Sequence, residues 1–480
     1  MSTPQGPIRG RLVSLLVVTA VFAVGCVNPE SGVIDATAGL PETPAVGVEA
    51  DNPGAQTPAE ANPLPAPSNV PDAPVPSLDD PSMPPVEETP ALDFPEPILI
   101  TEEPPDAGVW GETVVLVEAF WGENFAAFAG SGAYRPLDRD RIVAVDDNDS
   151  DLPACDRSRL SVSDIEQNAF AAVCREGQLV AWDDDDLFVD LFERFGATGP
   201  AIVIAHEFGH VSQFQAGVLN QATVVIEQQA DCLAGAFARW MDDRQIVPFD
   251  NAAALDAAVG STISFRDRPG SSAADPNAHG SGFDRVRAFQ DGFESGVEFC
   301  AFYDVGFLSG QLTEITFTEN DRQTGGNLAF VELIDLVNPY FDDVFGRLVD
   351  DWPGLVLAPA DLDEWRALHS QIGDNATGLA MALEFGAEAQ RQLGLSDGGV
   401  GAFLQQTCLA GAAFRPLIST IDGLTPDSLS LSAGDMDEAV LTLSRIVESN
   451  QDVLADGFLF EVVDELRTGF TDGFEACGLG

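Results

Sequence analysis

Two histidines and a glutamate in one short apolar segment have the residue types and the spacing for hydrolytic chemistry. His206 and His210 stand four residues apart, and Glu207 follows the first of them directly. The apolar run around them begins after Pro200 and ends at Gly217. Proline near the start and glycine just past the end are typical of a helix. On a helix both imidazoles share one face, about one turn apart, where a single tetrahedral zinc ion can bind both. Glu207 then projects beside the metal, in a position to take a proton from water.

A second segment supplies the ligand that two histidines leave missing. Residues 222–241 are predicted to form a helix in which Glu227 and Asp231 again stand four residues apart. With a rise of about 1.5 Å per residue, the chain climbs past His210, turns over residues 218–221 and returns Glu227 to the level of the histidines. Glu227 is therefore the candidate third ligand, and Asp231 is the candidate acceptor for the free ring N–H of a ligating histidine. Water would take the fourth position, which is typical of catalytic zinc sites.

The residues that follow the second histidine exclude one class of zinc peptidase. Positions 213 and 216 hold glutamine and alanine, where the metzincin pattern requires glycine and histidine. The arrangement that remains is that of a glutamate-zincin. The alternative is a helix with two histidines and no metal, although a chance His-Glu-x-x-His is improbable in a chain with 4 histidines.

These segments resemble a known family, the neutral zinc metallopeptidases of bacteria. The resemblance spans residues 115–300 and rests on Phe195-Gly-Ala, His206-Glu-Phe-Gly-His210, Glu227-Gln-Gln-Ala-Asp-Cys-Leu-Ala-Gly235, His279-Gly-Ser, Arg285-Val-Arg287 and Gly292-Phe-Glu-Ser-Gly296. It implies a zincin-like fold, helix-rich and of the α+β class. It also implies zinc held by His206, His210 and Glu227, with Glu207 as the general base that hydrolyses a peptide bond in a protein or peptide substrate.

Two further expectations concern the surroundings of the motif. His279 lies in a Gly- and Ser-rich loop after both motif helices, and near the zinc it would stabilise the oxyanion of a tetrahedral intermediate. The alternative is a surface histidine, or one that caps the following helix. Residues 141–145 and 178–182 are predicted strands, and we place the second at the sheet edge, where an extended peptide can pair with it.

Composition limits the classes of partner. The chain of 480 residues allows two or three domains, and its 22 basic against 78 acidic side chains leave a formal charge of −56, with no lysine at all. Such a charge makes nucleic acid an improbable partner and indicates a heavily hydrated surface.

The amino-terminal quarter is predicted to direct export and to act as a spacer. Residues 1–26 combine a short basic start with an apolar run too short to span a bilayer, and they end on small residues before Cys26, as in a lipobox. We expect a signal peptide with a lipid anchor on Cys26, so that the protein is an extracytoplasmic membrane lipoprotein; a cleaved, secreted form is the alternative. Residues 27–107, rich in Pro and acidic residues, are predicted to be a disordered tether.

Residues 108–305 form the predicted metallopeptidase domain, and residues 306–480 look like a degenerate copy of it. Three blocks of the second region align in order with the first: Ala382-Leu-Glu-Phe-Gly-Ala387 with Ala205-His-Glu-Phe-Gly-His210, Gln405-Gln-Thr-Cys-Leu-Ala-Gly411 with Gln229-Ala-Asp-Cys-Leu-Ala-Gly235, and Asp472-Gly-Phe-Glu475 with Asp291-Gly-Phe-Glu294. We infer an internal duplication. Leu383, Ala387 and Phe403 replace the three ligands, so this copy is predicted to bind no zinc.

The cysteines agree with export. Besides Cys26 the chain has six, an even set that favours disulfides in an exported protein. A bridge retained in both copies predicts the pairs Cys232–Cys300 and Cys408–Cys477, which leaves Cys155 with Cys174. Free buried thiols are the alternative.

The sequence therefore predicts an exported zinc metalloendopeptidase with one active and one degenerate zincin-like domain. The competing hypothesis is a non-catalytic envelope lipoprotein that binds protein or peptide ligands.

Overall fold

A computed structural model describes most of the chain from Ala107 onward. The described residues are 107–480 except 147–148, 150–151, 157, 166, 219–220, 273–277, 309–310, 314–316, 318–320, 358, 419–428, 451–453, 455–457 and 480. The predicted signal segment, Cys26 and the body of the predicted tether lie outside the described residues. None of the helices in the described part combines the length and apolar character needed to cross a membrane.

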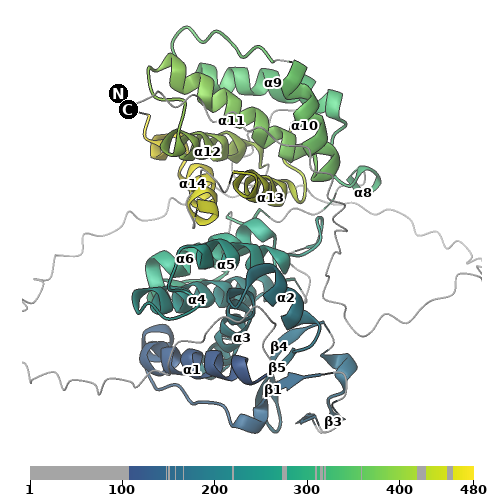
Figure 1. Ribbon diagram of the computed structural model, residues 1–480, viewed down its shortest axis with the longest axis vertical. Coiled ribbons are helices and arrows are strands. Elements are labelled where there is room, and N and C mark those ends of the chain that lie inside the picture. Colours follow the sequence, from purple (N-terminus) through teal and green to yellow (C-terminus); the bar gives the residue numbers. More distant parts are fainter. Residues whose placement is uncertain are drawn as a thin grey trace, which may run out of the picture. The chain divides into compact units, whose positions relative to one another are not determined.

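The fold is α+β and rich in helix, as the sequence predicts (Figure 1). The helices are α1 (Ala107–Ala129), α2 (Leu187–Phe195), α3 (Thr198–Ala216), α4 (Thr223–Asp243), α5 (Ala253–Ser264), α6 (Gly282–Cys300), α7 (Val305–Leu308), α8 (Asp321–Thr324), α9 (Phe330–Gly346), α10 (Pro359–Gln371), α11 (Asp374–Gln392), α12 (Val400–Phe414), α13 (Asp435–Glu448) and α14 (Phe458–Asp472). Short 3-10 turns lie at Arg139–Arg141, Val162–Asp164, Arg415–Leu417 and Phe474–Cys477.

A small sheet precedes the motif helices. Its strands are β1 (Ile142–Val145), β4 (Ala169–Cys174) and β5 (Gly177–Asp183), in the order β1-β5-β4, and β2 (Ala154–Cys155) pairs separately with β3 (Ser158–Arg159). β5 runs parallel to β1 and antiparallel to β4. Both predicted strands are confirmed, but the edge placement of residues 178–182 is wrong. The buried run at residues 179–183 of β5 reflects coverage of both faces of the sheet, since Val180 and Trp182 pack in the main hydrophobic core and Ala181 packs in a second cluster.

The two motif helices form where the sequence predicts them. α3 ends at Gly217, whose φ of 77° satisfies the left-handed cap that only glycine adopts without strain. α4 returns along α3, and at Gly209 the two backbones come close: a Cβ there would lie 3.3 Å from the Cα of Ala230. The glycine inside the His-Glu-x-x-His motif thus allows α4 to pack close to α3, which places the carboxylates of α4 beside the histidines.

α4 and α6 cross at very short range. A Cβ on Gly235 would lie 1.9 Å from the carbonyl oxygen of Phe289, and a Cβ on Gly292 would lie 1.7 Å from that of Cys232. No side chain fits in either place, so both glycines are required by packing. A disulfide between Cys232 and Cys300 joins the same two helices.

α12 and α14 repeat this crossing in the carboxyl-terminal part. A Cβ on Gly411 would lie 2.1 Å from the carbonyl oxygen of Leu466, and a Cβ on Gly469 would lie 1.8 Å from that of Cys408. Cys408 is bridged to Cys477. With the third bridge, between Cys155 and Cys174, the structure forms the three disulfides that the sequence predicts.

Buried glutamines also make the same contacts in both regions. Gln213 on α3 donates to the carbonyl of Ile226 at 2.8 Å and to Oε1 of Gln229 at 3.0 Å. Gln390 on α11 donates to the carbonyl of Ala402 at 3.1 Å and to Oε1 of Gln405 at 2.7 Å.

The two accepting glutamines continue the likeness. Gln229 donates to the carbonyl of Cys300, and Gln405 donates to that of Cys477. Gln229 and Gln405 thus each accept a hydrogen bond from a glutamine on the preceding helix. Each also donates to the carbonyl of the second cysteine of the neighbouring disulfide.

The third aligned block is out of register by about one helical turn. Gly292 and Gly469 occupy equivalent places at their helix crossings, whereas the sequence alignment paired Gly292 with Gly473. Gly473 instead matches Gly296, because both have a φ of 77° and extended ψ, and both precede the bridged cysteine by four residues. The repeated Asp-Gly-Phe-Glu letters caused the error, since a glycine pair one turn apart offers two alignments.

Candidate metal centre

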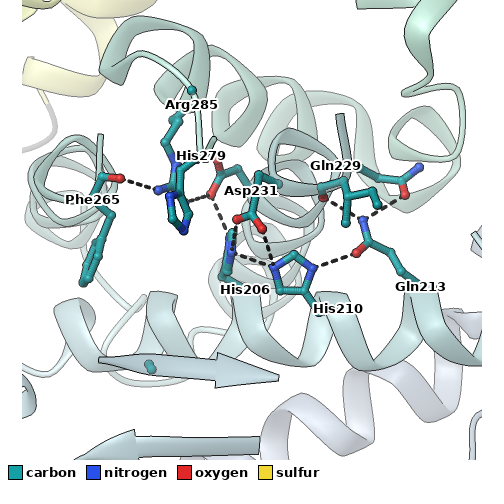
Figure 2. A network of polar contacts seen from close by, with 12 residues as sticks. His206, His210, Gln213, Gln229, Asp231, Phe265, His279 and Arg285 are labelled. Atoms are coloured by element: carbon teal, nitrogen blue, oxygen red, sulfur yellow. Dashed lines mark hydrogen bonds and ion pairs between the residues drawn. The ribbon is translucent and has the colours of Figure 1, made fainter. Parts of the chain in front are cut away.

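Three side chains from α3 and α4 converge on one point. Nε2 of His206 lies 3.1 Å from Nε2 of His210. The carboxylate of Glu227 lies 3.2 Å from Nε2 of His206 and 3.4 Å from Nε2 of His210. Figure 2 shows the two rings side by side above α3, with Asp231 over them. The predicted placement of Glu227 at the level of the histidines is therefore what the structure shows.

These separations fit a zinc ion. Bonds of about 2.0–2.1 Å in tetrahedral geometry place neighbouring ligand atoms about 3.3 Å apart, close to the three distances observed. Among the described residues this trio is one of two groups of acidic or histidine side chains close enough to hold a metal, and the one that contains nitrogen donors. Two imidazoles and a carboxylate are a donor set that zinc favours in catalytic sites.

Each histidine is oriented through its other ring nitrogen. Nδ1 of His206 lies 2.8 Å from Oδ1 of Asp231, and Nδ1 of His210 lies 2.8 Å from Oε1 of Gln213. An Nδ1–H bound to an oxygen acceptor fixes the tautomer that leaves Nε2 free for a metal. The role predicted for Asp231 as a partner of a ligating histidine thus agrees with its position.

Asp231 is itself held by a buried arginine. Nε of Arg285 donates to Oδ2 of Asp231 and a terminal nitrogen donates to Oδ1, both at 2.8 Å. Arg285 also donates to the carbonyl of Phe265, as Figure 2 shows. This two-point ion pair links α6 to the metal centre. It also fixes the carboxylate that orients His206.

The charges of the centre are strongly coupled. Burial lowers the pKa of His206, but the carboxylates of Asp231 and Glu227 outweigh burial and raise it to about 10. Burial opposes ionisation of Glu227, yet the two imidazoles hold the pKa of its carboxyl well below the usual range. A metal cation would compete with protons for the same nitrogen and oxygen atoms.

Glu207 lies within the same buried space. It is 7 % exposed, and its Oε2 has no hydrogen-bond partner within the described part of the chain. Burial raises the pKa of its carboxyl, while the charges of His206 and His210 lower it. A buried carboxylate oxygen without a partner, beside two imidazoles, is suited to accept a proton from a bound water.

His279 lies outside the converging trio. Its backbone N–H donates to Oδ2 of Asp267 at 2.8 Å, and its Nδ1 lies 3.5 Å from Oδ1 of the same carboxylate. Its ring is labelled near Asp231 in Figure 2, and its charge lowers the pKa of Glu207. The predicted oxyanion role of His279 therefore stays a prediction.

The contacts of two supporting residues were not predicted. Gln213 departs from the metzincin pattern, and its contact with His210 was not expected, although a side chain three positions after His210 shares its helix face. Arg285 stood in a segment recognised by resemblance, but its pairing with Asp231 joins residues that are 54 positions apart. Helical periodicity could have predicted the contact of Gln213 with His210. No local feature of the sequence predicts the contact of Arg285 with Asp231.

Comparison with known proteins agrees with this geometry. Residues 173–301 match the family described as "Putative neutral zinc metallopeptidase". The matched segment contains the three converging side chains, Glu207 and Asp231. The family resemblance predicted from the sequence is thereby confirmed.

The curated relatives carry no description of activity. An uncharacterized protein of Mycobacterium bovis and uncharacterized proteins of two Mycobacterium tuberculosis strains are each 31% identical to the chain over 143 residues. The match covers 24% of this chain and 49% of each relative, so the chain spans about half the length of the curated relatives it matches. No solved structure matches the chain.

Proposed function

From the match of residues 173–301 to the neutral zinc metallopeptidases, we propose that this protein is a zinc-dependent metalloendopeptidase. The observation that carries the proposal is the convergence of His206, His210 and Glu227 with tetrahedral spacing beside Glu207. The substrate class would be protein or peptide.

The chain's own residues account for the proton transfers. Bound zinc would supply Lewis acidity, which lowers the pKa of a water to about 7 and polarises a carbonyl. Glu207 would accept the proton of the attacking water and later give it to the leaving amine. Its raised pKa suits both steps, because a more basic carboxylate takes the proton more readily at neutral pH.

Substrate binding is proposed at the edge of the sheet. Among the described strands, β4 is paired on one side only, to β5. β4 also contacts the motif helix α3. An extended peptide that adds to β4 would therefore run past the metal centre, with main-chain hydrogen bonds giving affinity. This replaces the strand of residues 178–182 in that role.

Peptidase assays on Glu207→Gln test the proposed mechanism. The amide cannot accept a proton, so we expect activity on a denatured protein to fall by about 10²- to 10⁴-fold while zinc stays bound. Glu384→Gln is the matched control, since Glu384 occupies the aligned position on α11 where Leu383 and Ala387 replace the histidines. A Glu207→Gln variant as active as the wild type would overturn the mechanism.

We also propose that the protein is exported and anchored by lipid on Cys26. Support comes from the sequence of residues 1–26 and from three disulfides, which persist in oxidising compartments. Membrane fractionation of the wild type and Cys26→Ser tests the anchor. We expect the wild type in the membrane fraction and the variant outside it; the same distribution for both would contradict lipidation.

The carboxyl-terminal part is proposed to be a duplicate that has lost zinc chemistry. Support comes from glycine crossings, glutamine contacts and a disulfide that α3, α4 and α6 share with α11, α12, α14 and the 3-10 turn after α14. At the ligand positions the copy has Leu383, Ala387 and Phe403, whose side chains cannot bind zinc.

The competing hypothesis, a lipoprotein that binds peptides without cleaving them, shares the zinc site. A cleavage assay with and without a chelator separates the two. Chelator-sensitive cleavage supports the peptidase, and absence of cleavage by the zinc-loaded chain supports the binding protein.

A further inference from the structure

A second group of carboxylates lies in the carboxyl-terminal part, far along the chain from the zinc ligands. Asp374 is the first residue of α11, and Asp435 and Glu438 lie in the first turn of α13. Their closest carboxylate oxygens all fall within 4.8 Å of one another. Asp374 is 4 % exposed and Asp435 is 5 % exposed. Two of the three acidic groups are thus buried, and the third, Glu438, is partly buried.

One oxygen in this group has no partner. Oδ2 of Asp374 accepts a hydrogen bond from the backbone of Leu328 at 2.7 Å, but its buried Oδ1 has none within the described part of the chain. A cavity of about 20 Å³ is lined by Asp374, Asn375, Ser430 and Asp435, with mostly apolar residues around the rest. That volume suffices for about one water molecule.

No arginine in the described residues forms an ion pair with any of the three carboxylates. Burial raises the pKa of Asp435 well above its usual range, and the charge of Asp374 adds to the effect. Burial, together with the charges of Asp435 and Asp374, raises the pKa of Glu438 to about 9. The group therefore needs either protons or a cation to balance its charge.

Hydrogen bonding at helix starts explains only part of the arrangement. Asp437, in the same turn of α13, accepts from the backbone of Phe283 at 2.9 Å, as expected of a carboxylate that caps a neighbouring helix. Asp374 differs, because one of its oxygens is satisfied in this way and the other is buried without a hydrogen-bond partner among the described residues. A purely capping role leaves that oxygen without a function.

We propose that Asp374, Asp435 and Glu438 bind a divalent cation, with calcium as the best fit. The donors are oxygen only, which suits hard cations and not zinc. Calcium accepts irregular geometry with six to eight oxygens at about 2.3–2.6 Å, whereas magnesium requires a near-ideal octahedron. Three carboxylates can supply up to six oxygens, and the cavity can hold a water that adds one more. The cation ties the start of α11 to the start of α13 and so stabilises the carboxyl-terminal part.

Thermal unfolding of the zinc-loaded full chain tests the site. Protein dialysed into calcium-free buffer with zinc is titrated with calcium chloride, and with magnesium chloride in parallel. Calcium at saturating concentration should raise the melting temperature by ~3 °C or more, and magnesium at the same concentration should raise it less. No response to calcium, or a larger response to magnesium, would overturn the assignment.

Two neutral variants locate the cation. Asp374→Asn and Glu438→Gln keep an oxygen for the backbone donors at Leu328 and Asn375, so both should fold. Because each removes one buried negative charge, each should be at least as stable as the wild type without calcium and should lose the calcium-dependent shift. Asp350→Asn, at an exposed acidic residue, is the control and should keep the full shift. A calcium shift that persists in both site variants would refute the proposal.

Discussion

The metal centre depends on residues that do not touch the metal position. His206 is oriented by Asp231, and Asp231 is held at two points by Arg285, so a line of alternating charges runs from α3 through α4 to α6. Burial opposes ionisation of Asp231, but Arg285 and His206 lower the pKa of its carboxyl below the usual value. The orientation of one ring is thereby built into the packing of three helices.

Asp231→Asn tests this line of charges. The amide cannot balance the buried guanidinium of Arg285, so the free energy of unfolding should fall by about 3–5 kcal/mol. Loss of the partner of His206 should also weaken zinc binding by about 10- to 100-fold. Urea unfolding and zinc titration measure the two effects.

Asp243→Asn is the control for that substitution. Asp243 pairs with Arg239 on the surface of α4, and such exposed pairs contribute at most about 0.5 kcal/mol. If Asp231→Asn were no more harmful to stability and zinc affinity than Asp243→Asn, the proposed role of the buried pair would be wrong.

The sequence was informative at this scale where the chemistry is local. Spacing of four residues on a helix placed His206 with His210, and Glu227 with Asp231. The contact of Asp231 with Arg285 was not predictable, because it depends on how α6 crosses α4. That crossing is set by two glycines whose role appears only when both helices are present.

At the scale of elements, those crossings are the features that both halves share. Gly235 and Gly292 let α4 and α6 meet, and Gly411 and Gly469 do the same for α12 and α14. A disulfide joins α4 to α6, and a second joins α12 to the 3-10 turn that follows α14. Backbone contact at this range fixes the rotation of each helix about its axis, and therefore the direction in which α4 presents Glu227.

Gly235→Ala and Gly411→Ala test the crossings in parallel. An added methyl would meet backbone carbonyls that cannot rotate away, so each variant should lose about 3 kcal/mol or more of unfolding free energy. Gly235→Ala should also weaken zinc binding, whereas Gly411→Ala should affect stability alone. Denaturant unfolding and zinc titration give both readouts.

Gly111→Ala on α1 is the control for the helical context. No atom lies within 4 Å of a Cβ at Gly111, so alanine should stabilise the helix by about 0.5–1 kcal/mol. If Gly235→Ala were as stable as the wild type or more stable, as is expected for Gly111→Ala, the crossing would tolerate a side chain.

Sequence reasoning succeeded for helices and failed for strand order. Pro200 lies in the first turn of α3 and Gly217 caps its end, and both could be predicted because their effects on the backbone are local. The order β1-β5-β4 depends on pairing between strands that are distant in sequence, so a central strand was taken for an edge. The one-turn error in the third repeated block has a similar origin, because Gly292 and Gly296 are both plausible partners for Gly473.

On the scale of the whole described chain, the two halves share one hydrophobic core that runs from α1 to α14. Polar contacts also join them. Arg467 on α14 pairs with Asp291 and Glu294 on α6, and the backbone of Phe460 donates to Asp256 at 3.0 Å. We therefore expect the halves to unfold together.

Urea unfolding of zinc-loaded wild type and Arg467→Met tests this coupling. The wild type should show one transition, and the variant should lose about 2 kcal/mol because the partly buried Asp291 loses its guanidinium partner. Arg347→Met, which removes an exposed pair with Asp343, should change little. Two separate transitions in the wild type would contradict a shared core.

The most direct test of the account is the zinc content of the purified chain and of its Glu227→Gln variant after dialysis. We predict about one zinc ion per chain in the wild type and loss of most of it in the variant, because a neutral amide is a poor zinc ligand. A variant that keeps as much zinc as the wild type would show that Glu227 is not a ligand and would contradict the central claim.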